Sequence, residues 1–111
     1  MRPPYIRCDD MCRATMNTLG YHVIIWDLDT DDYNQDSAQL IQNSKNNVLA
    51  AITDSDPRVR SFLSIAHDIH QQTVMNLTSF QIDVGRAKGY RHVRLGDCMG
   101  DPEANWYRTQ L

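Results

Sequence analysis

Hydrophobic residues follow two periods along this chain of 111 residues, one typical of strands and the other of helices. Two short runs rich in β-branched and aromatic residues, at 21–29 and 61–66, predict buried strands. Apolar residues three and four positions apart predict helices at 37–52 and at about 70–88. In chain order, the predicted elements are helix 9–19, strand 21–29, helix 37–52, strand 61–66, helix 70–88 and strand 92–95.

The predicted helices have suitable end residues and apolar stripes. Asp9 or Asp10 can cap the first helix, while Gly20 and Gly89 suit the ends of the first and the last helix. The stripes that predict core-facing positions are Leu40, Ile41, Val48, Leu49 and Ile52 in helix 37–52, and Val74, Leu77, Phe80, Val84 and Ala87 in helix 70–88.

This order of elements predicts an α/β fold. Strands that alternate with helices form consecutive βα units, in which the strands are parallel and the crossovers right-handed. Three strands with their helices make only part of a (β/α) barrel. The predicted sheet therefore has an open edge on both sides.

Acidic residues gather where the first predicted strand ends. The stretch 21–33, YHVIIWDLDTDDY, runs from apolar residues into the carboxylates of Asp27, Asp29, Asp31 and Asp32. Asp29 and His67 each end a predicted strand, so they are expected at one edge of the sheet, at or close to hydrogen-bond distance. A carboxylate beside the imidazole favours its protonated form, as a general acid near neutral pH requires. The plainer alternative is a solvated acidic loop.

Composition excludes some classes of function. The chain is 41% hydrophobic and 23% charged, an ordinary globular balance. A net charge of −3 argues against a general binder of nucleic acid or of anionic membranes. No apolar run approaches the length of a membrane span, and the opening MRPPYIRCDD does not resemble a signal peptide.

The three cysteines leave two interpretations open. Cys8 and Cys12 are four residues apart, or one helical turn, so a local disulfide is geometrically possible. Cys98 would then be an odd thiol. The alternative is three reduced cysteines in a cytosolic core. The Cys-x3-Cys spacing is not the Cys-x2-Cys of zinc ribbons.

Two local motifs suggest other chemistry. Asp27-x-Asp29-x-Asp31 is similar to the start of a calcium loop, but Asp32 and Ala38 stand where that loop requires Gly and Glu. VIIWDLDTD and Gly96-Asp97-x-x-x-Asp101 resemble two motifs of the haloacid dehalogenase-type phosphatases. In that comparison Asp31 replaces Thr or Val, and Thr30 replaces a glycine.

His67 and His70 stand three residues apart at the start of a predicted helix. Such a pair can hold a metal together with a carboxylate. The alternative, which this spacing favours, is that one histidine is held in a fixed position and the other lies on the surface without a metal.

Three stretches together resemble the third, fourth and fifth motifs of the polysaccharide deacetylases, the NodB-homology fold of carbohydrate esterase family four. They are RPPY at 2–5, DTDDY at 29–33 and IAHD at 65–68. Cys8-Asp-Asp-x-Cys12, AHDIHQQTV and GDCMGDPEANWYR are similar to the fungal chitin deacetylases of that family. The resemblance covers essentially the whole chain and implies a deformed TIM-like barrel.

The resemblance implies catalytic roles for four residues. Arg2 orients the family's catalytic base, and the backbone N–H of Tyr5 helps to hold the oxyanion. His67 is the general acid that protonates the leaving sugar amine, and Asp29 pairs with it.

The resemblance also implies residues that bind the substrate. Ile65, where the family usually has Leu, lines the pocket for the acetate methyl group. Tyr33, where the family usually has Trp, forms a wall of the sugar site. Trp26 and Asp32 complete the expected substrate-binding residues.

The family's first two motifs, which supply the base aspartate and the metal ligands, precede the RPPY segment. The chain shows no His-x-x-x-His pair, so it is expected to be the C-terminal portion, 1–111, of a deacetylase domain. The divalent metal of the intact enzyme, zinc or cobalt, would have no ligand in this chain. The partner of Cys98 in the resembled enzymes lies near their N-terminus.

These features lead to one main hypothesis. The intact protein hydrolyses N-acetyl groups of chitin or a related N-acetylated polysaccharide, outside the cell or in the cell wall, and this chain is inactive alone. The alternatives are a carbohydrate-binding remnant without catalysis and the phosphatase.

Overall fold

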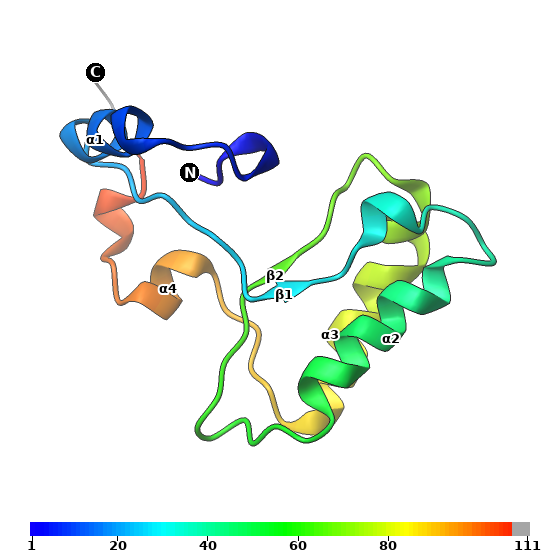
Figure 1. Cartoon of the computed structure of the whole chain (residues 1–111). Coiled ribbons are helices and arrows are strands. Elements are labelled where there is room, and N and C mark those ends of the chain that lie inside the picture. The colour runs from blue at the N-terminus through cyan, green and yellow to red at the C-terminus, as the bar shows by residue number, and fades with distance from the viewer. Residues whose placement is uncertain (108–111) are drawn as a thin grey trace. The chain divides into compact units, whose positions relative to one another are not determined.

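The structure, a computed structural model, describes residues 1–107. Two compact units make up this part of the chain: residues 26–92 form one, and residues 1–25 with 93–107 belong to the other (Figure 1). No helix among the described residues is long and apolar enough to cross a membrane.

Two parallel strands form the sheet of the unit 26–92. β1 (Leu28–Asp29) pairs with β2 (Ser64–Ile65), with Leu28 opposite Ser64 and Asp29 opposite Ile65. The helix α2 (Ile41–Ile52) lies between them in the sequence, which makes a βαβ unit and confirms the predicted parallel α/β arrangement. Both strands are shorter than predicted, and the ladder covers only the last part of each apolar run.

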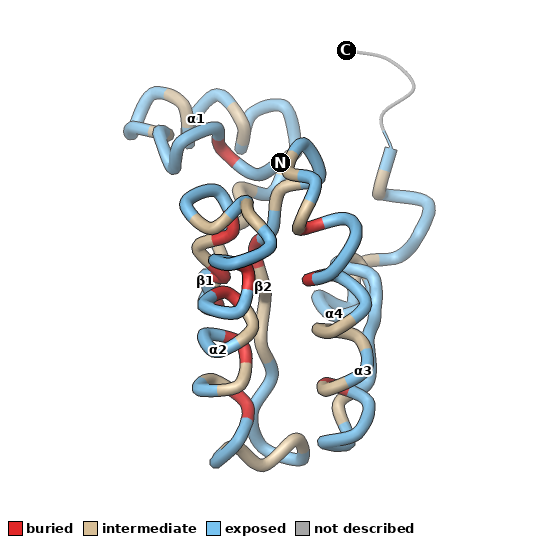
Figure 2. Tube along the Cα trace, turned by 90° about the vertical axis from the view of Figure 1, so that its right-hand side faces the viewer, coloured by how far each residue is buried: buried red, intermediate tan, exposed pale blue. Residues whose placement is uncertain are grey.

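The core of this unit is formed by β1, α2 and Leu77, which directly precedes the helix α3 (Thr78–Lys88). Its buried members are Leu28, Ile41, Val48, Ile52 and Leu77, with Phe80 and Val84 partly buried against them. Figure 2 marks buried positions in red along α2 and the strands. Three of the five predicted α2 positions are buried, whereas Leu40 precedes the helix and is 44% exposed.

A π-helix, η3 (Thr73–Leu77), precedes α3 without a break. A π turn contains more residues than an α turn, so it changes which side chains face the core. Thr73 and Leu77 are buried, while Val74 is 53% exposed. The prediction that Val74 faces the core was therefore wrong, and so was that for Ala87, which is exposed. Gly89 ends α3 with φ 94°, as predicted.

The predicted strand 92–95 was wrong, because the short helix α4 (Leu95–Met99) begins there. The Arg94 guanidinium bonds the carboxylate of Asp97 at 2.9 Å and lies 4.3 Å from the ring centre of Trp106. These contacts favour a turn over an extended chain. Trp106 also packs where a side chain at Gly96 would stand, since a Cβ there would lie 2.1 Å from its ring.

The helix α1 (Asp10–Thr18) and a disulfide organise the segment 8–20. Asp9 caps α1 by accepting from the backbone N–H of Cys12 at 2.8 Å. Cys8 and Cys12 form a disulfide with their Cα atoms 5.2 Å apart, which confirms the local bridge. Cys98 is a free and exposed thiol among the described residues.

Replacing Leu77 with Ala should lower the free energy of unfolding by about 2–5 kcal/mol, because it leaves a cavity in the core of the unit 26–92. Met75 lies in the same π-helix but is 67% exposed, so Met75→Ala is the matched control and should change it by about 0.5 kcal/mol or less. Urea unfolding of both variants tests this. Equal losses would contradict the assigned core.

The disulfide also predicts a thiol count. Under denaturing, non-reducing conditions, iodoacetamide should label one cysteine per chain, Cys98, and reduction should expose two more. Peptide mass spectrometry checks both counts. Labelling of Cys8 or Cys12 before reduction would contradict the bridge.

Candidate active site

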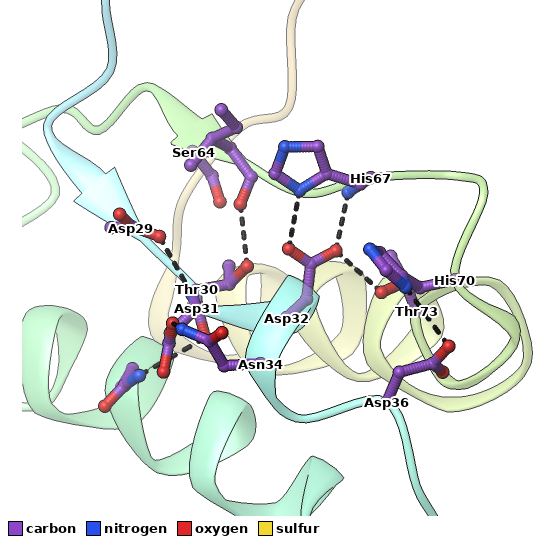
Figure 3. Close-up of polar contacts among 12 residues, drawn as sticks. Asp29, Thr30, Asp31, Asp32, Asn34, Asp36, Ser64, His67, His70 and Thr73 are labelled. Atoms are coloured by element: carbon purple, nitrogen blue, oxygen red, sulfur yellow. Dashed lines mark hydrogen bonds and ion pairs between the residues drawn. The ribbon is translucent and has the colours of Figure 1, made fainter. Parts of the chain in front are cut away.

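A buried carboxylate forms the centre of the candidate site. Asp32 opens the short 3-10 helix η2 (Asp32–Asn34) just after β1, and its side chain is 0% exposed. Its Oδ1 lies 2.8 Å from Nδ1 of His67, and its Oδ2 accepts from the backbone N–H of His67 at 2.6 Å. The hydroxyl of Thr73 donates to the same Oδ2 at 2.7 Å (Figure 3).

These contacts correct the expected partner of His67, which is Asp32 rather than Asp29. The shared edge was predicted correctly, because Asp29 stands opposite Ile65 in the parallel ladder. The strand alternation that pointed to Asp29 ends with β1, however. Asp31 adopts a left-handed conformation with φ 56°, and Oδ1 of Asp29 accepts from the Asp31 N–H at 2.9 Å. This turn directs the carboxylate of Asp32 toward His67.

Asp32 is ionised despite its burial. Burial raises the pKa of this carboxyl, but the hydrogen bonds from Thr73 and from the ring and backbone of His67 outweigh it, so the pKa is lowered. An ionised carboxylate only accepts hydrogen bonds, so the proton between the two side chains belongs on Nδ1 of His67. Nε2 is then the nitrogen available to exchange a proton, and the His67 side chain is 38% exposed.

A second Asp–His pair joins the same two segments. Nδ1 of His70 lies 3.1 Å from Asp36, whose other oxygen accepts from the Gln72 N–H at 2.9 Å (Figure 3). The bonds from Gln72 and then His70 hold the pKa of Asp36 below its ordinary value. The ring centroids of His67 and His70 are 6.1 Å apart. In each histidine it is Nδ1 that contacts the aspartate, Asp32 for His67 and Asp36 for His70.

Tyr33 is the aromatic side chain beside His67. The two rings meet edge to face with centroids 5.6 Å apart, and Tyr33 is 49% exposed. The negative charge of Asp29, with burial and the charges of Asp31 and Asp32, raises the pKa of the Tyr33 phenol. Tyr33 therefore offers a neutral aromatic surface next to the imidazole.

The other expected substrate-binding residues of the unit 26–92 lie on or near the strands. Ile65 is 6% exposed, and its carbonyl accepts from the hydroxyl of Thr30 at 2.8 Å. Trp26 is partly buried and stands two residues before the start of β1. Their contact with substrate stays a prediction.

Arg2 and Tyr5 belong to the other unit. Tyr5 lies in the 3-10 helix η1 (Pro4–Ile6) with a 93% exposed side chain. Its φ is 52° and that of Ile6 is 61°, values that cost non-glycine residues conformational energy. Among the described non-glycine residues, positive φ occurs only in the RPPYI and DTDDY segments. The catalytic roles of Arg2 and Tyr5 stay predictions.

The described residues do not fit the divalent metal that the resemblance implies. They contain no group of three or more His, Cys, Asp or Glu side chains that could hold a metal ion. The first aspartate of the phosphatase-like motif is also engaged, because Oδ1 of Asp27 accepts from the Leu63 N–H at 2.6 Å. Its second motif, with Asp97 and Asp101, lies in the other unit.

Sequence reasoning did not find Thr73, Asp36 or the bond of His70 to Asp36. The pairing of Asp36 with His70 spans 34 residues, so no local pattern signals it. Thr73 lies within AHDIHQQTV, a stretch that is similar to the fungal chitin deacetylases, but its spacing from Asp32 gives no sign that the two side chains meet.

Comparisons with known proteins place the chain in a class. No family model matches it. It is 41% identical over 112 residues to a chitin deacetylase of Colletotrichum lindemuthianum, across 98% of this chain and 44% of that protein. It is 37% identical to a probable peptidoglycan-N-acetylglucosamine deacetylase of Arthroderma benhamiae, across 98% of this chain and 24% of that protein. The solved structure of the chitin deacetylase from the fungal pathogen Colletotrichum lindemuthianum matches with a TM-score of 0.94 and 38% identity.

The parallel strands and their helices are thus part of a deacetylase barrel, which defines the class of the fold. Within that class the chain is fungal chitin deacetylase-like in both sequence and structure. The structural match covers 100% of this chain and 49% of the solved chain. The chain therefore spans less than half the length of these relatives.

Asp32 should make stability depend on pH. Because its pKa is lower in the folded chain, it stabilises the fold above its unfolded pKa, and this contribution is lost as pH falls through the folded pKa. Asp32→Asn should remove this part of the pH dependence. Its destabilisation should be largest at about pH 7 and decline in acid, as urea unfolding at several pH values would show.

Asp29→Asn is the matched control, because the Asp29 carboxylate is exposed and accepts its hydrogen bond from the backbone N–H of Asp31 instead of from a histidine. It should keep the pH dependence of the parent chain. If instead Asp29→Asn removed that dependence and Asp32→Asn kept it, the assigned pair would be wrong.

Proposed function

We propose that this chain is a portion, residues 1–111, of a metal-dependent polysaccharide N-deacetylase domain that acts on chitin or a related N-acetylated polysaccharide. The observation that carries the proposal is the Asp32–His67 pair at the sheet edge of a chain that is similar to chitin deacetylases. In it, His67 is the general acid and Asp32 orients it.

The proposed reaction is hydrolysis of the acetamide of N-acetylglucosamine. The oxygen of a water molecule bonds to the carbonyl carbon as the base aspartate that the resemblance implies takes one of its protons, the carbon–nitrogen bond breaks, and the nitrogen leaves as an amine. His67 donates a proton from Nε2 to that nitrogen, and the products are acetate and the free amine. Asp32 fixes the orientation of the imidazole before the transfer, through its bonds to the ring and the backbone N–H of His67.

Other residues take the roles that the resemblance implies. Tyr33 flanks the sugar beside His67, and Ile65 and Trp26 contribute to the pocket. Arg2 orients a base aspartate, and the Tyr5 N–H helps to hold the oxyanion. The left-handed backbone of Tyr5 and Ile6 supports a functional role for that turn, because such conformations concentrate at functional sites.

The described residues contain no cluster that could hold a metal ion. The metal of the intact enzyme, zinc or cobalt, is therefore proposed to be held by residues that are not part of this chain. The 111-residue chain alone is accordingly proposed to be inactive. The protein is proposed to work outside the cell or in the cell wall. The Cys8–Cys12 disulfide supports that location, because such bonds persist in oxidising compartments.

A chimeric enzyme tests this function. In it, residues 1–111 replace the aligned segment of the Colletotrichum lindemuthianum chitin deacetylase. The chimera should release acetate from chitin oligomers, whereas the 111-residue chain should not. His67→Asn should lower kcat by about 10²–10⁴-fold and change KM less, because the proton is transferred in the transition state.

The control for the chimera is His22→Asn, which alters an exposed histidine and should leave kcat unchanged. A folded chimera whose kcat survives His67→Asn would contradict the proposed acid. A folded chimera that binds chitin oligomers but releases no acetate would favour the carbohydrate-binding remnant.

A further inference from the structure

We propose that Thr73 is a positioning residue of the candidate active site: its hydroxyl, presented by the π-helix η3, holds the carboxylate of Asp32 in the orientation that aligns His67. This inference rests on the proposed function for its catalytic consequence. The hydrogen bond on which it is based belongs to the fold itself.

The geometry of the carboxylate gives Thr73 this role. Thr73 is 2% exposed, and its Oγ1 donates to Oδ2 of Asp32 at 2.7 Å. The two other bonds to this carboxylate, at 2.6 and 2.8 Å, both come from His67. Thr73 is thus the donor that holds the carboxylate independently of the histidine to be aligned. Without its hydroxyl, the carboxylate and His67 could rotate together.

The π-helix explains why a threonine reaches this carboxylate. The wide turn buries Thr73 and Leu77 together, and Leu77, which is 0% exposed, anchors the turn in the core. The Thr78 hydroxyl donates to the Thr73 carbonyl at 2.8 Å, a bond that spans five residues and supports the turn. Such π turns occur frequently at functional sites. Here the π turn leaves Val74 exposed and places the Thr73 side chain against Asp32.

The hydrogen bond from Thr73 and the contacts of His67 together lower the pKa of Asp32 against the effect of burial. His67 is the titratable group that attracts the carboxylate, and His70 lies beside His67. Tyr33, on the same segment as Asp32, feels the negative charges of the neighbouring aspartates. The bond from the Thr73 hydroxyl is the largest single cause that lowers the pKa of Asp32, and His67 lowers it further through its ring, its backbone N–H and its charge. Because Thr73 is uncharged, replacing it changes no charge at the site.

Two variants separate the hydroxyl from the volume of the side chain. Thr73→Val keeps the shape and removes the donor, whereas Thr73→Ser keeps the donor. The matched control is Thr30→Val, which removes another fully buried hydroxyl whose bond, at 2.8 Å, goes to the Ile65 carbonyl instead of to Asp32. Thr73→Val should lose more stability than Thr30→Val, because a hydrogen bond to a buried charged carboxylate contributes more than one to a neutral carbonyl.

The first readout needs no activity. Titration of the Asp32 carboxyl by ¹³C NMR in the 111-residue chain should give a pKa that is higher in Thr73→Val than in the parent. Thr73→Ser should restore the parent pKa, and Thr30→Val should keep it. A folded Thr73→Val chain in which Asp32 titrates as in the parent would overturn the proposal.

The second readout is kinetic, in the chimera. Thr73→Val should lower kcat by about tenfold or more and change KM by about twofold or less, with recovery in Thr73→Ser. A loss of kcat equal to that of Thr30→Val would overturn the positioning role. If the parent chimera releases no acetate, the proposed function fails, and the Asp32 titration still decides the role of Thr73.

A second variant is needed if Thr73→Val does not fold. Thr73→Ala, which cannot clash, then takes its place in both measurements. If neither variant folds while Thr30→Val does, the hydroxyl is needed for folding, and the proposal is overturned.

Discussion

The rest of the site depends on a single constraint: the carboxylate of Asp32 is ionised and has no exposure to water. A buried charge is costly unless hydrogen bonds replace its hydration. Here the donors come from His67 and Thr73, 35 and 41 residues further along the chain. Satisfying this carboxylate therefore fixes the segment after β2 and the start of the long helix against the turn after β1. The bonds that stabilise Asp32 are the same ones that orient the candidate acid.

Local and periodic features could be predicted from the sequence. The inner face of α2, with Ile41, Val48 and Ile52, follows from the helical repeat, and the parallel strands follow from the order of elements. The Asp9 cap and the Cys8–Cys12 bridge depend on residues at most four positions apart. These features are decided by short stretches of chain, which a sequence pattern describes well.

Two of the predictions that were wrong, for Asp29 and for Val74, share a physical cause, which is a change of backbone geometry that no local sequence pattern indicates. Alternation indicated Asp29, but the left-handed backbone at Asp31 ended it and brought Asp32 to His67. The helical repeat indicated Val74, but the π turn brought Thr73 to the inside. One rotation of the chain moved the partner of His67 from Asp29 three residues on to Asp32, and the other moved the inward side chain from Val74 to Thr73. Long-range bonds stabilise both rotations.

The four aspartates after the apolar run raise a problem of repulsion, which the structure resolves by giving each carboxylate its own donors. Asp27 accepts from the Leu63 N–H, Asp29 from the Asp31 N–H, and Asp31 from the side-chain amides of Asn34 and Gln35. These three carboxylates bond backbone or amide groups and thereby shape the turn. Asp32 alone among the four bonds a histidine in the described structure. Three carboxylates of the acidic cluster thus have a structural role and help to position the fourth, Asp32. The chemistry of the cluster lies in Asp32, because it is the one of the four that contacts a side chain able to exchange a proton, His67.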